Sequence, residues 1–401
     1  METTTFDIHP TDAERELILR YADADVRQVA FKLRPSADVR PQYVLQQIAG
    51  RVAMRSKVPS WNQEGLIYPV HLSVEQCSSE ATAIYKAHLV ERLKGGRKDG
   101  HLVDLTGGLG VDFSFLSEYF EHSTYIELNA ELLQIAEHNF SVVGVRNAEV
   151  VSTDGVLFLH NMPEKVSCLF IDPARRSKNG AKTVLLSDCT PDLTQLEAQM
   201  VSKADFAIAK LSPMLDVSAA LSELHCVSEV HAVAVGNECK ELLIVMQTDA
   251  PCEPILFAVA DNRIFSFTLS EEKNATSQFT NNVCRYLYEP ASSVLKVGAF
   301  RTIGARFGLK KLHQNSHLYT SDEVHSNFLG RIFEVLSVGT LHSLPPTMQN
   351  VSKANIATRN FPLRPEEIRK RLKIADGGTD YLFGTTLSDG RKVLIHCIKT
   401  Q

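Results

Sequence analysis

The sequence predicts an α/β protein built on a doubly wound parallel sheet, and three observations support this prediction. Short apolar strands alternate with helical segments over residues 101–172. The first strand runs into a glycine turn that opens a helix. Four successive strands each have an acidic residue at or just after their carboxyl end: Asp104, Glu127, Asp154 and Asp172. Strands that alternate with helices form parallel sheets, which bind ligands at the carboxyl ends of their strands.

The segment 101–112, HLVDLTGGLGVD, is the most informative stretch of the chain. A strand over 101–104 leads through the glycine turn into a helix that opens at Val111. Glycines allow a ligand to approach the backbone closely, and the bare N–H groups of a helix N-terminus attract polar or negative ligand groups. The turn therefore predicts a nucleoside-cofactor site formed by Asp104, Thr106, Gly107, Gly108 and Gly110.

The next elements extend this site. A short strand over 123–127 ends in Glu127, which lies 17 residues past Gly110, close to the spacing of an acid that binds ribose hydroxyls. A helix over 129–143, a strand over 148–152 and a buried strand over 166–171 follow. The further residues predicted to bind the cofactor are Asn129, Asp154 and Gly155.

The sheet is expected to end differently from a dinucleotide-binding sheet. Strands over 205–210 and 229–235 are followed by a turn and a seventh strand over 241–247, which together predict a terminal antiparallel hairpin. Binding of NAD is the main alternative, but its Gly-x-Gly-x-x-Gly pattern needs a third glycine where this chain has Phe113.

At these residues the chain resembles the class I S-adenosylmethionine-dependent methyltransferases, over roughly residues 70–250. The resemblance implies a Rossmann-like seven-stranded sheet and S-adenosylmethionine as cofactor. It makes 104–110 the first motif, Glu127 the ribose-binding acid, Asp154 the adenine-contacting acid, and Asp172 the start of the catalytic motif. More narrowly, DLTGGLGVD, DPARR and KLSP resemble a bacterial group of THUMP-like methyltransferases with an appended ferredoxin-like region.

The catalytic motif departs from that of base-amine methyltransferases, because Ala174 and Arg175 stand where those enzymes carry a second proline and an aromatic residue. Arg175 can stack on a base or bind a phosphate through its planar guanidinium. Asp172 can accept a hydrogen bond from the acceptor or only brace the loop. The reaction is expected to be a direct displacement that depends on alignment. The predicted catalytic residues are Asp172, Pro173, Arg175 and Arg176.

A carbon-methylating mechanism would instead need a cysteine nucleophile, for which Cys189 and Cys239 are the candidates near that edge of the sheet. The eight cysteines contain no Cys-x-x-Cys pair, so we expect reduced thiols, no structural zinc and no metal site.

Residues 1–95 predict a helical domain, with helical spacing over 12–21, 40–52 and 75–93. Trp61, the single tryptophan, is either a stacking platform for a base or, more commonly in such a segment, a packing anchor. The polar residues just before the first strand either line the cofactor or target pocket or form a helix cap. They are Gln76, Ser78, Ser79 and Glu80, of which Ser78 and Glu80 are predicted to contact the substrate.

Residues 96–250 are expected to form the methyltransferase domain and residues 251–401 a mixed α+β region, ferredoxin-like or THUMP-like by the resemblance. Strands are expected over 255–259, 263–269, 317–320, 332–336 and 392–398, and helices over about 293–307 and 365–372. Further target contacts are predicted at Asn237 and Glu238. The basic cluster Arg369, Lys370 and Arg371 is either a docking site for phosphates or a solvated helix face.

Charge is distributed unevenly along the chain. Residues 96–250 carry 11 Lys and Arg against 22 Asp and Glu, whereas residues 251–401 carry 19 against 13. A basic carboxyl-terminal region suggests contact with a polyanion, although the two regions can also attract one another. The 401 residues, 44% of them hydrophobic, suffice for two to four domains. Without a long apolar run or signal-like start, we expect a soluble cytoplasmic protein with no membrane partner. The sequence does not indicate the oligomeric state.

The favoured function is an S-adenosylmethionine-dependent methyltransferase that modifies structured RNA, tRNA or rRNA, docked by the basic region. One alternative is a methyltransferase for a small molecule or a protein. Another is a non-catalytic RNA-binding protein on a methyltransferase scaffold, which the four intact acids disfavour.

Overall fold

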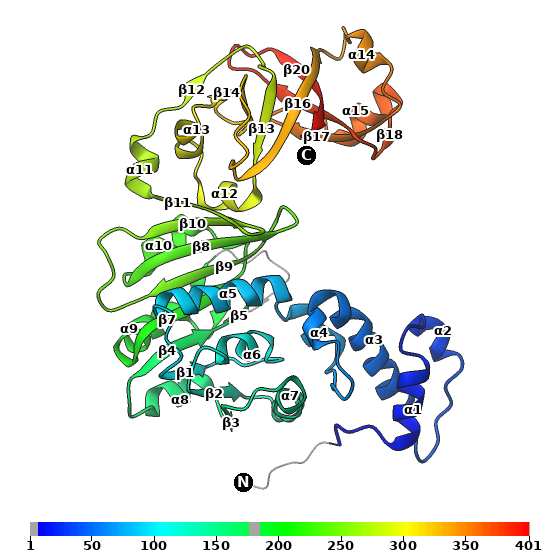
Figure 1. The fold of residues 1–401 in the computed structure, drawn as a ribbon, viewed down its shortest axis with the longest axis vertical. Coiled ribbons are helices and arrows are strands. Elements are labelled where there is room, and N and C mark those ends of the chain that lie inside the picture. The colour runs from blue at the N-terminus through cyan, green and yellow to red at the C-terminus, as the bar shows by residue number, and fades with distance from the viewer. Residues whose placement is uncertain (1–6, 176–184, 401) are drawn as a thin grey trace. The chain divides into compact units, whose positions relative to one another are not determined.

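The protein is described by a computed structural model that covers residues 7–175 and 185–400 (Figure 1). It divides into two compact units. The first contains residues 1–228 and 242–251, and the second contains residues 229–241 and 252–401. The three domains expected from the sequence, with boundaries after 95 and 250, stay a prediction.

All seven expected strands of the predicted sheet form, in the order β3-β2-β1-β4-β7-β9-β8. Parallel pairing joins β1 to β2 and β4, β2 to β3, and β4 to β7, whereas β9 is antiparallel to β7. The strands are β1 (His101–Asp104), β2 (His122–Glu127), β3 (Ala148–Ser152), β4 (Val166–Ile171), β7 (Ala204–Leu211), β8 (Val227–Val235) and β9 (Glu238–Met246).

The predicted count of seven strands is wrong, because two more strands extend this sheet to nine. The strands β10 (Ile255–Ala260), parallel to β8, and β11 (Arg263–Thr268), antiparallel to β10, were expected in the carboxyl-terminal region instead. Without β10, β8 would be an edge strand with unpaired N–H and C=O groups. The apolar segment ILFAVA returns alongside β8 and pairs them.

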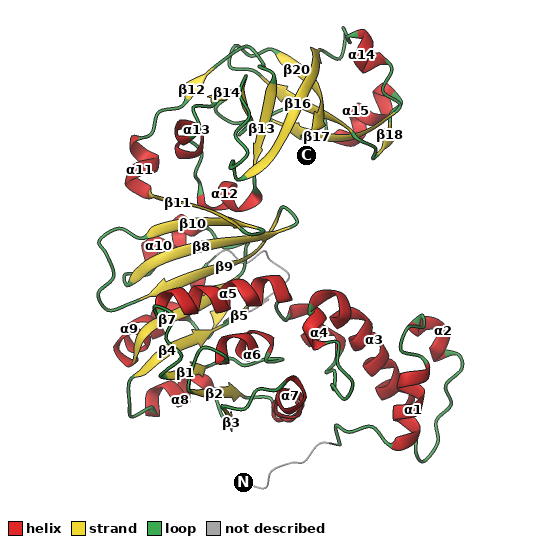
Figure 2. Cartoon of the chain, viewed as in Figure 1, coloured by secondary structure: helices red, strands yellow, loops and turns green. Residues whose placement is uncertain are grey.

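Helices flank the strands of the first unit (Figure 2). Side chains of Asn129, Asp154, Asp192 and Asp216 each cap a helix by accepting a backbone N–H, which explains why these helices begin where they do. The helices are α6 (Val111–Ser117), α7 (Ala130–Val143), α8 (Gly155–Asn161), α9 (Leu193–Lys203) and α10 (Val217–Glu223). A small antiparallel pair, β5 (Ala174–Arg175) with β6 (Cys189–Thr190), follows β4 and lies near the 3₁₀ turn η2 (Leu186–Asp188).

The amino-terminal region is helical, as expected, but the predicted helix over 75–93 is interrupted. Cys77 ends α4, and Ser79 caps α5 in an extended conformation. Trp61 is 3% exposed and packs in an apolar core, which confirms the packing-anchor interpretation. The elements are α1 (Asp12–Arg20), α2 (Val26–Ala30), α3 (Pro41–Lys57), η1 (Pro59–Trp61), α4 (His71–Gln76) and α5 (Glu80–Leu93).

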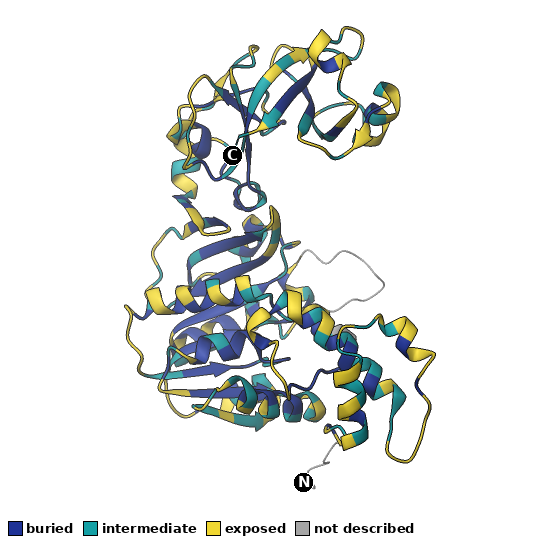
Figure 3. Ribbon diagram, turned by 45° about the vertical axis from the view of Figure 1, so that its right-hand side comes forward, coloured by how far each residue is buried: buried dark blue, intermediate teal, exposed yellow. Residues whose placement is uncertain are grey.

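The second unit contains another nine-stranded sheet, of order β12-β14-β15-β13-β16-β20-β19-β17-β18, in which β13, β19 and β20 are largely buried (Figure 3). The helix expected around 293–307 is divided in two by Gly298, which has a φ of +80° and ends α12. The strands are β12 (Gln278–Phe279), β13 (Tyr286–Pro290), β14 (Lys310–Lys311), β15 (Tyr319–Ser321), β16 (Gly330–Gly339), β17 (Lys353–Arg359), β18 (Ala375–Asp376), β19 (Asp380–Thr386) and β20 (Lys392–Lys399). The helices are α11 (Leu269–Asn274), α12 (Ser292–Val297), α13 (Thr302–Arg306), α14 (Pro346–Gln349) and α15 (Pro365–Leu372).

Among the described helices, none combines the length and the apolar character that a membrane crossing requires.

Candidate functional site

The glycine loop, residues 105–110 between β1 and α6, packs tightly on aromatic side chains. A Cβ at Gly107 would lie 2.1 Å from the Tyr125 ring, and a Cβ at Gly110, where φ is +82°, would lie 2.6 Å from the Phe140 ring. The N–H of Gly107 donates to the carbonyl of Ile126 at 2.8 Å. Glycine is therefore required at both positions for the loop to lie against β2 and α7.

Glu127, at the end of β2, is held by backbone groups on both of its carboxylate oxygens. Gly108 N donates to Oε2 at 2.9 Å, and Asn129 N donates to Oε1 at 2.7 Å. A carboxylate has about four acceptor positions, so Glu127 can accept further hydrogen bonds from ligand hydroxyls. A Cβ at Gly108 would meet no atom closer than 3.9 Å, so there is space in front of this backbone that a ligand can enter.

Three of the predicted residues form one hydrogen-bonded chain. Asp104 Oδ1 accepts from the N–H of Thr106 at 2.9 Å, and Thr106 Oγ1 accepts from the N–H of Asp172 at 2.6 Å. The chain joins the glycine loop to the loop after β4. Burial raises the pKa of the Asp104 carboxyl to about 8, and the nearby carboxylates of Asp112 and Asp172 act in the same direction. Asp104 therefore braces the loop from beneath, as a neutral acid at pH 7.

Asp154 and Gly155 position the start of α8. Asp154 is exposed, and its Oδ1 accepts from the N–H of Leu157 at 2.9 Å. A Cβ at Gly155 would lie 2.0 Å from the carbonyl oxygen of Leu105. The start of α8 therefore touches the glycine loop directly, and brings Asp154 to the same edge of the sheet.

Next to the glycine loop, five side chains from four separate segments form a charged cluster, consisting of Ser78, Lys86, Asp112, Asp172 and Lys210. Lys210 Nζ lies 2.6 Å from Asp172 Oδ2, 3.1 Å from Asp112 Oδ2 and 3.1 Å from Ser78 Oγ. Lys86 Nζ lies 3.2 Å from Asp112 Oδ1, and Ser78 Oγ donates to Asp112 Oδ2 at 2.7 Å. The structure thus links the predicted residues Ser78 and Asp172 through groups that the sequence did not single out.

Three members of the charged cluster, Lys86, Asp112 and Lys210, were missed by the sequence analysis. Each is a charged residue in an apolar context, as in the strand DFAIAK that ends in Lys210, and this is the signal that could have found them. Burial alone would raise the pKa of Asp112, but the ammonium groups of Lys210 and Lys86 outweigh it and lower that pKa to about 2. Asp112 is therefore an anion paired with Lys86, which is buried, and with Lys210, which is mostly buried.

The other residues predicted near this edge of the sheet are not members of the charged cluster. Glu80 accepts a hydrogen bond from the N–H of Ser60 at 2.7 Å and so holds the segment before Trp61. Pro173 is buried. Arg175 pairs through its backbone with Cys189, and Arg176 lies outside the described residues.

The predicted target contacts of the second unit make contacts within that unit. Asn237, in the turn after β8, accepts from the N–H of Ser292 at 3.2 Å, and Glu238 pairs with Lys240 at 2.6 Å. On α15, Arg369 forms an ion pair with Asp376, whereas Lys370 and Arg371 are exposed. The basic cluster therefore presents two exposed cations and one that is partly neutralised.

The thiols offer little support for a cysteine nucleophile. Burial raises the pKa of Cys239 to about 11, which keeps its thiol protonated near neutral pH, and Cys189 is buried. Within residues 7–175 and 185–400, no group of three or more His, Cys, Asp or Glu side chains is placed to hold a metal ion.

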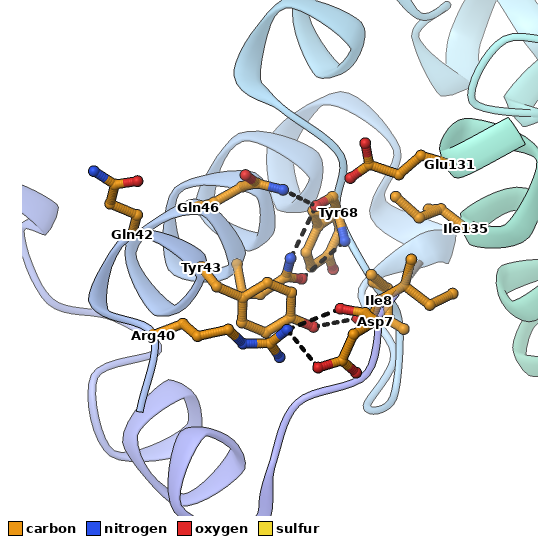
Figure 4. A pocket seen from close by; sticks show the side chains of 11 residues that line it. Asp7, Ile8, Arg40, Gln42, Tyr43, Gln46, Tyr68, Glu131 and Ile135 are labelled. Atoms are coloured by element: carbon orange, nitrogen blue, oxygen red, sulfur yellow. Dashed lines mark hydrogen bonds and ion pairs between the residues drawn. The ribbon is translucent and has the colours of Figure 1, made fainter. Parts of the chain in front are cut away.

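A cavity of about 370 Å³ lies elsewhere in the first unit, between the amino-terminal segment, α3 and α7 (Figure 4). Several of its polar groups already bind the protein itself: Arg40 donates to Asp7 and to Glu14, and Tyr43 Oη donates to the carbonyl of Ile8 at 2.6 Å. The described residues that line it include none of the predicted site residues. We interpret this cavity as space left where these helices pack together, rather than as the cofactor site.

Comparisons with known proteins agree with this organisation. A family model of a ferredoxin-like domain matches residues 286–328, and a THUMP domain-like model matches residues 330–399. The crystal structure of a candidate methyltransferase from Porphyromonas gingivalis W83 is 36% identical in sequence, with a TM-score of 0.85. That match covers 98% of this chain and 99% of the other. An uncharacterized S-adenosylmethionine-dependent methyltransferase of Mycobacterium tuberculosis H37Rv is 24% identical over 307 residues, covering 74% of this chain and 80% of that protein.

Proposed function

The chain belongs to the class I S-adenosylmethionine-dependent methyltransferases, in the bacterial group with ferredoxin-like and THUMP-like carboxyl-terminal regions, and we propose that its methyl acceptor is structured RNA. The observation that carries the proposal is the charge contrast along the chain. Residues 251–401 have a net charge of +6, whereas residues 96–250 have a net charge of −11. A polyanion would be attracted to the basic region and repelled by the acidic region, so the basic region is suited to dock it.

We propose that the cofactor lies against the glycine loop. S-adenosylmethionine supplies an electrophilic methyl group on a sulfonium. Glu127 would accept hydrogen bonds from the ribose hydroxyls, and the open space at Gly108 would let the nucleoside approach the backbone. Asp154 would contact the adenine. The remaining predicted residues would shape this cradle: Asp104, Thr106, Gly107, Gly110, Asn129 and Gly155.

We propose that Asp172 faces the acceptor. Its side chain is 38% exposed, and its Oδ2 is engaged by Lys210. The other carboxylate oxygen would then accept a hydrogen bond from an N–H or O–H of the methyl acceptor. This hydrogen bond would orient the acceptor's lone pair toward the methyl group. Pro173, Arg175 and Arg176 would complete the acceptor site, with the two arginines on phosphate or base.

Transfer of an isotopically labelled methyl group tests the proposal. Total RNA from a strain that lacks the gene is incubated with the protein and labelled S-adenosylmethionine, and modified nucleosides are identified by mass spectrometry. We expect label in one nucleoside with the wild type, and none with Asp172→Ala or Arg175→Ala, both of which should bind the cofactor nearly as tightly as the wild type by calorimetry. A wild-type protein that binds the cofactor but transfers no label to this RNA would refute an RNA acceptor.

The salt dependence of RNA binding tests the docking surface. Replacing Lys370 and Arg371 with Gln should weaken binding and flatten the slope of log affinity against log salt by about 1.4, at about 0.7 per lost phosphate contact on single strands. Adding Arg369→Gln should raise this to roughly 2, less if its pair with Asp376 keeps it off phosphate. The matched control replaces Arg97 and Lys98, two exposed cations of the first unit, and should leave the slope unchanged. Equal slopes in all these proteins would mean that the cluster is only a solvated helix face.

A further inference from the structure

Lys210, the next-to-last residue of β7, is the centre of the charged cluster. Its ammonium lies 2.6 Å from Asp172 Oδ2, a distance typical of a charge-assisted hydrogen bond. The same ammonium lies 3.1 Å from both Asp112 Oδ2 and Ser78 Oγ. One cation therefore joins the end of β7, the first turn of α6, the segment before α5 and the loop after β4.

The charged cluster becomes more exposed from its base toward Asp172. The side chain of Lys86 is fully buried, those of Asp112 and Lys210 are 10% and 12% exposed, and that of Asp172 is 38% exposed. Lys86 and Ser78 fix Asp112, Asp112 and Ser78 fix Lys210, and Lys210 holds Asp172. The most solvent-accessible of the four ionised groups is thus the carboxylate that we propose for the acceptor.

We propose that Lys210 is a positioning residue for methyl transfer, which fixes the Asp172 carboxylate in the orientation that receives the acceptor. This inference rests on the proposed function. Among the described residues, Asp172 is held at two points: its N–H donates to Thr106 Oγ1 at 2.6 Å, and its Oδ2 lies 2.6 Å from Lys210 Nζ. Without the ammonium, the backbone would stay in place while the carboxylate could rotate toward solvent. A displacement of about 1 Å can cost a hundredfold in rate.

The test combines variants of Lys210 with a double-mutant cycle. Lys210→Met should lower kcat for methyl transfer to total RNA about a hundredfold, with affinity for S-adenosylmethionine and KM for RNA changed less than threefold. Lys210→Arg, which keeps the charge, should have a kcat at least tenfold higher than that of Lys210→Met. If Lys210 acts through Asp172, the double variant with Asp172→Asn, which keeps a hydrogen-bond acceptor and measurable turnover, should be no slower than Asp172→Asn alone.

A matched control uses the ion pair between Lys165 and Asp205, which lies at the other end of strands β4 and β7. Lys165 lies 2.9 Å from Asp205, where both side chains are exposed, and Lys165→Met should leave kcat unchanged. If Lys210→Met does not fold, Lys210→Gln replaces it in the cycle. Wild-type kcat in the folded Lys210 variant, or a double variant whose loss is the product of the two single losses, would overturn the proposal.

Failure of the proposed function can be told apart from failure of this inference. If the wild type methylates no RNA, the proposed acceptor is wrong, and the Lys210–Asp172 pair is then judged by urea unfolding of the same four proteins. Non-additive changes in unfolding midpoint would support the pair, and additive changes would overturn it.

Discussion

The glycine loop and the charged cluster lie side by side in the first unit but are built in opposite ways. The loop is a contiguous stretch, held by backbone N–H groups and by the absence of side chains at Gly107 and Gly110. The cluster is held by ionised side chains, two of which, Ser78 and Lys210, are 132 residues apart in the chain. In the function proposed above, the loop would hold the cofactor through its shape, whereas the cluster would orient the acceptor side through charge.

The largest expected effect is a loss of stability, and it tests whether the glycine loop depends on the absence of a side chain at Gly110. Gly110→Ala should destabilise the protein by about 4 kcal/mol, because the new Cβ overlaps the Phe140 ring and a positive φ is costly for alanine. Gly144→Ala is the matched control: φ is +85° there, with no atom within 4 Å of the new Cβ, so only about 1–2 kcal/mol should be lost. Urea unfolding measures both. Equal losses would show that the aromatic packing beneath the loop is unimportant.

The next effect tests the influence of charge on the loop. Because the pKa of folded Asp104 is raised to about 8, its contribution to stability is greatest at low pH and is lost as the pH rises from about 4 to 8. Asp104→Asn keeps the hydrogen bond from Thr106 and removes the titration. Between pH 5 and 9, the free energy of unfolding of the wild type should therefore fall by about 4 kcal/mol more than that of the variant. Parallel curves for the two proteins would contradict an acid kept neutral by burial.

The smallest effect tests the ligand side of the loop. Glu127→Ala and Gly108→Val should each weaken S-adenosylmethionine binding at least tenfold, a loss of about 1.4 kcal/mol. Glu131→Ala, a nearby exposed acid on α7, is the control and should bind normally. Calorimetry that finds wild-type affinity in both folded test variants would remove the cofactor from this loop.

The contrast also explains what the sequence could predict. The structure of residues 104–127 could be predicted from local sequence, because glycines and acids at fixed distances from the strand ends indicate a particular backbone geometry. The parallel sheet and its terminal antiparallel hairpin could be inferred in the same way from the alternating elements, whereas the strand order β3-β2-β1-β4-β7-β9-β8 is known from the structure.

Features that depend on distant partners could not be predicted. Lys86 and Lys210 looked like isolated charges, since their partner Asp112 is brought to them only by folding. The strands β10 and β11 were recognised as strands, but their pairing with β8 is a tertiary choice that no local pattern encodes. The helix break at 77–79 places Ser78 in the cluster. The spacing of apolar residues does not mark this break, but the alternative interpretation of 76–80 as a helix cap does, since Ser79 caps α5.

The way the chain passes between the two units limits how this protein can be divided. It enters the second unit at 229, leaves it at 241 and returns at 252. A fragment that starts at 252 would lack β8, and β10 would lose its parallel neighbour and become an open edge prone to aggregation. The second unit is therefore not a separable carboxyl-terminal tail, and a graft of it onto another enzyme would have to include residues 229–241.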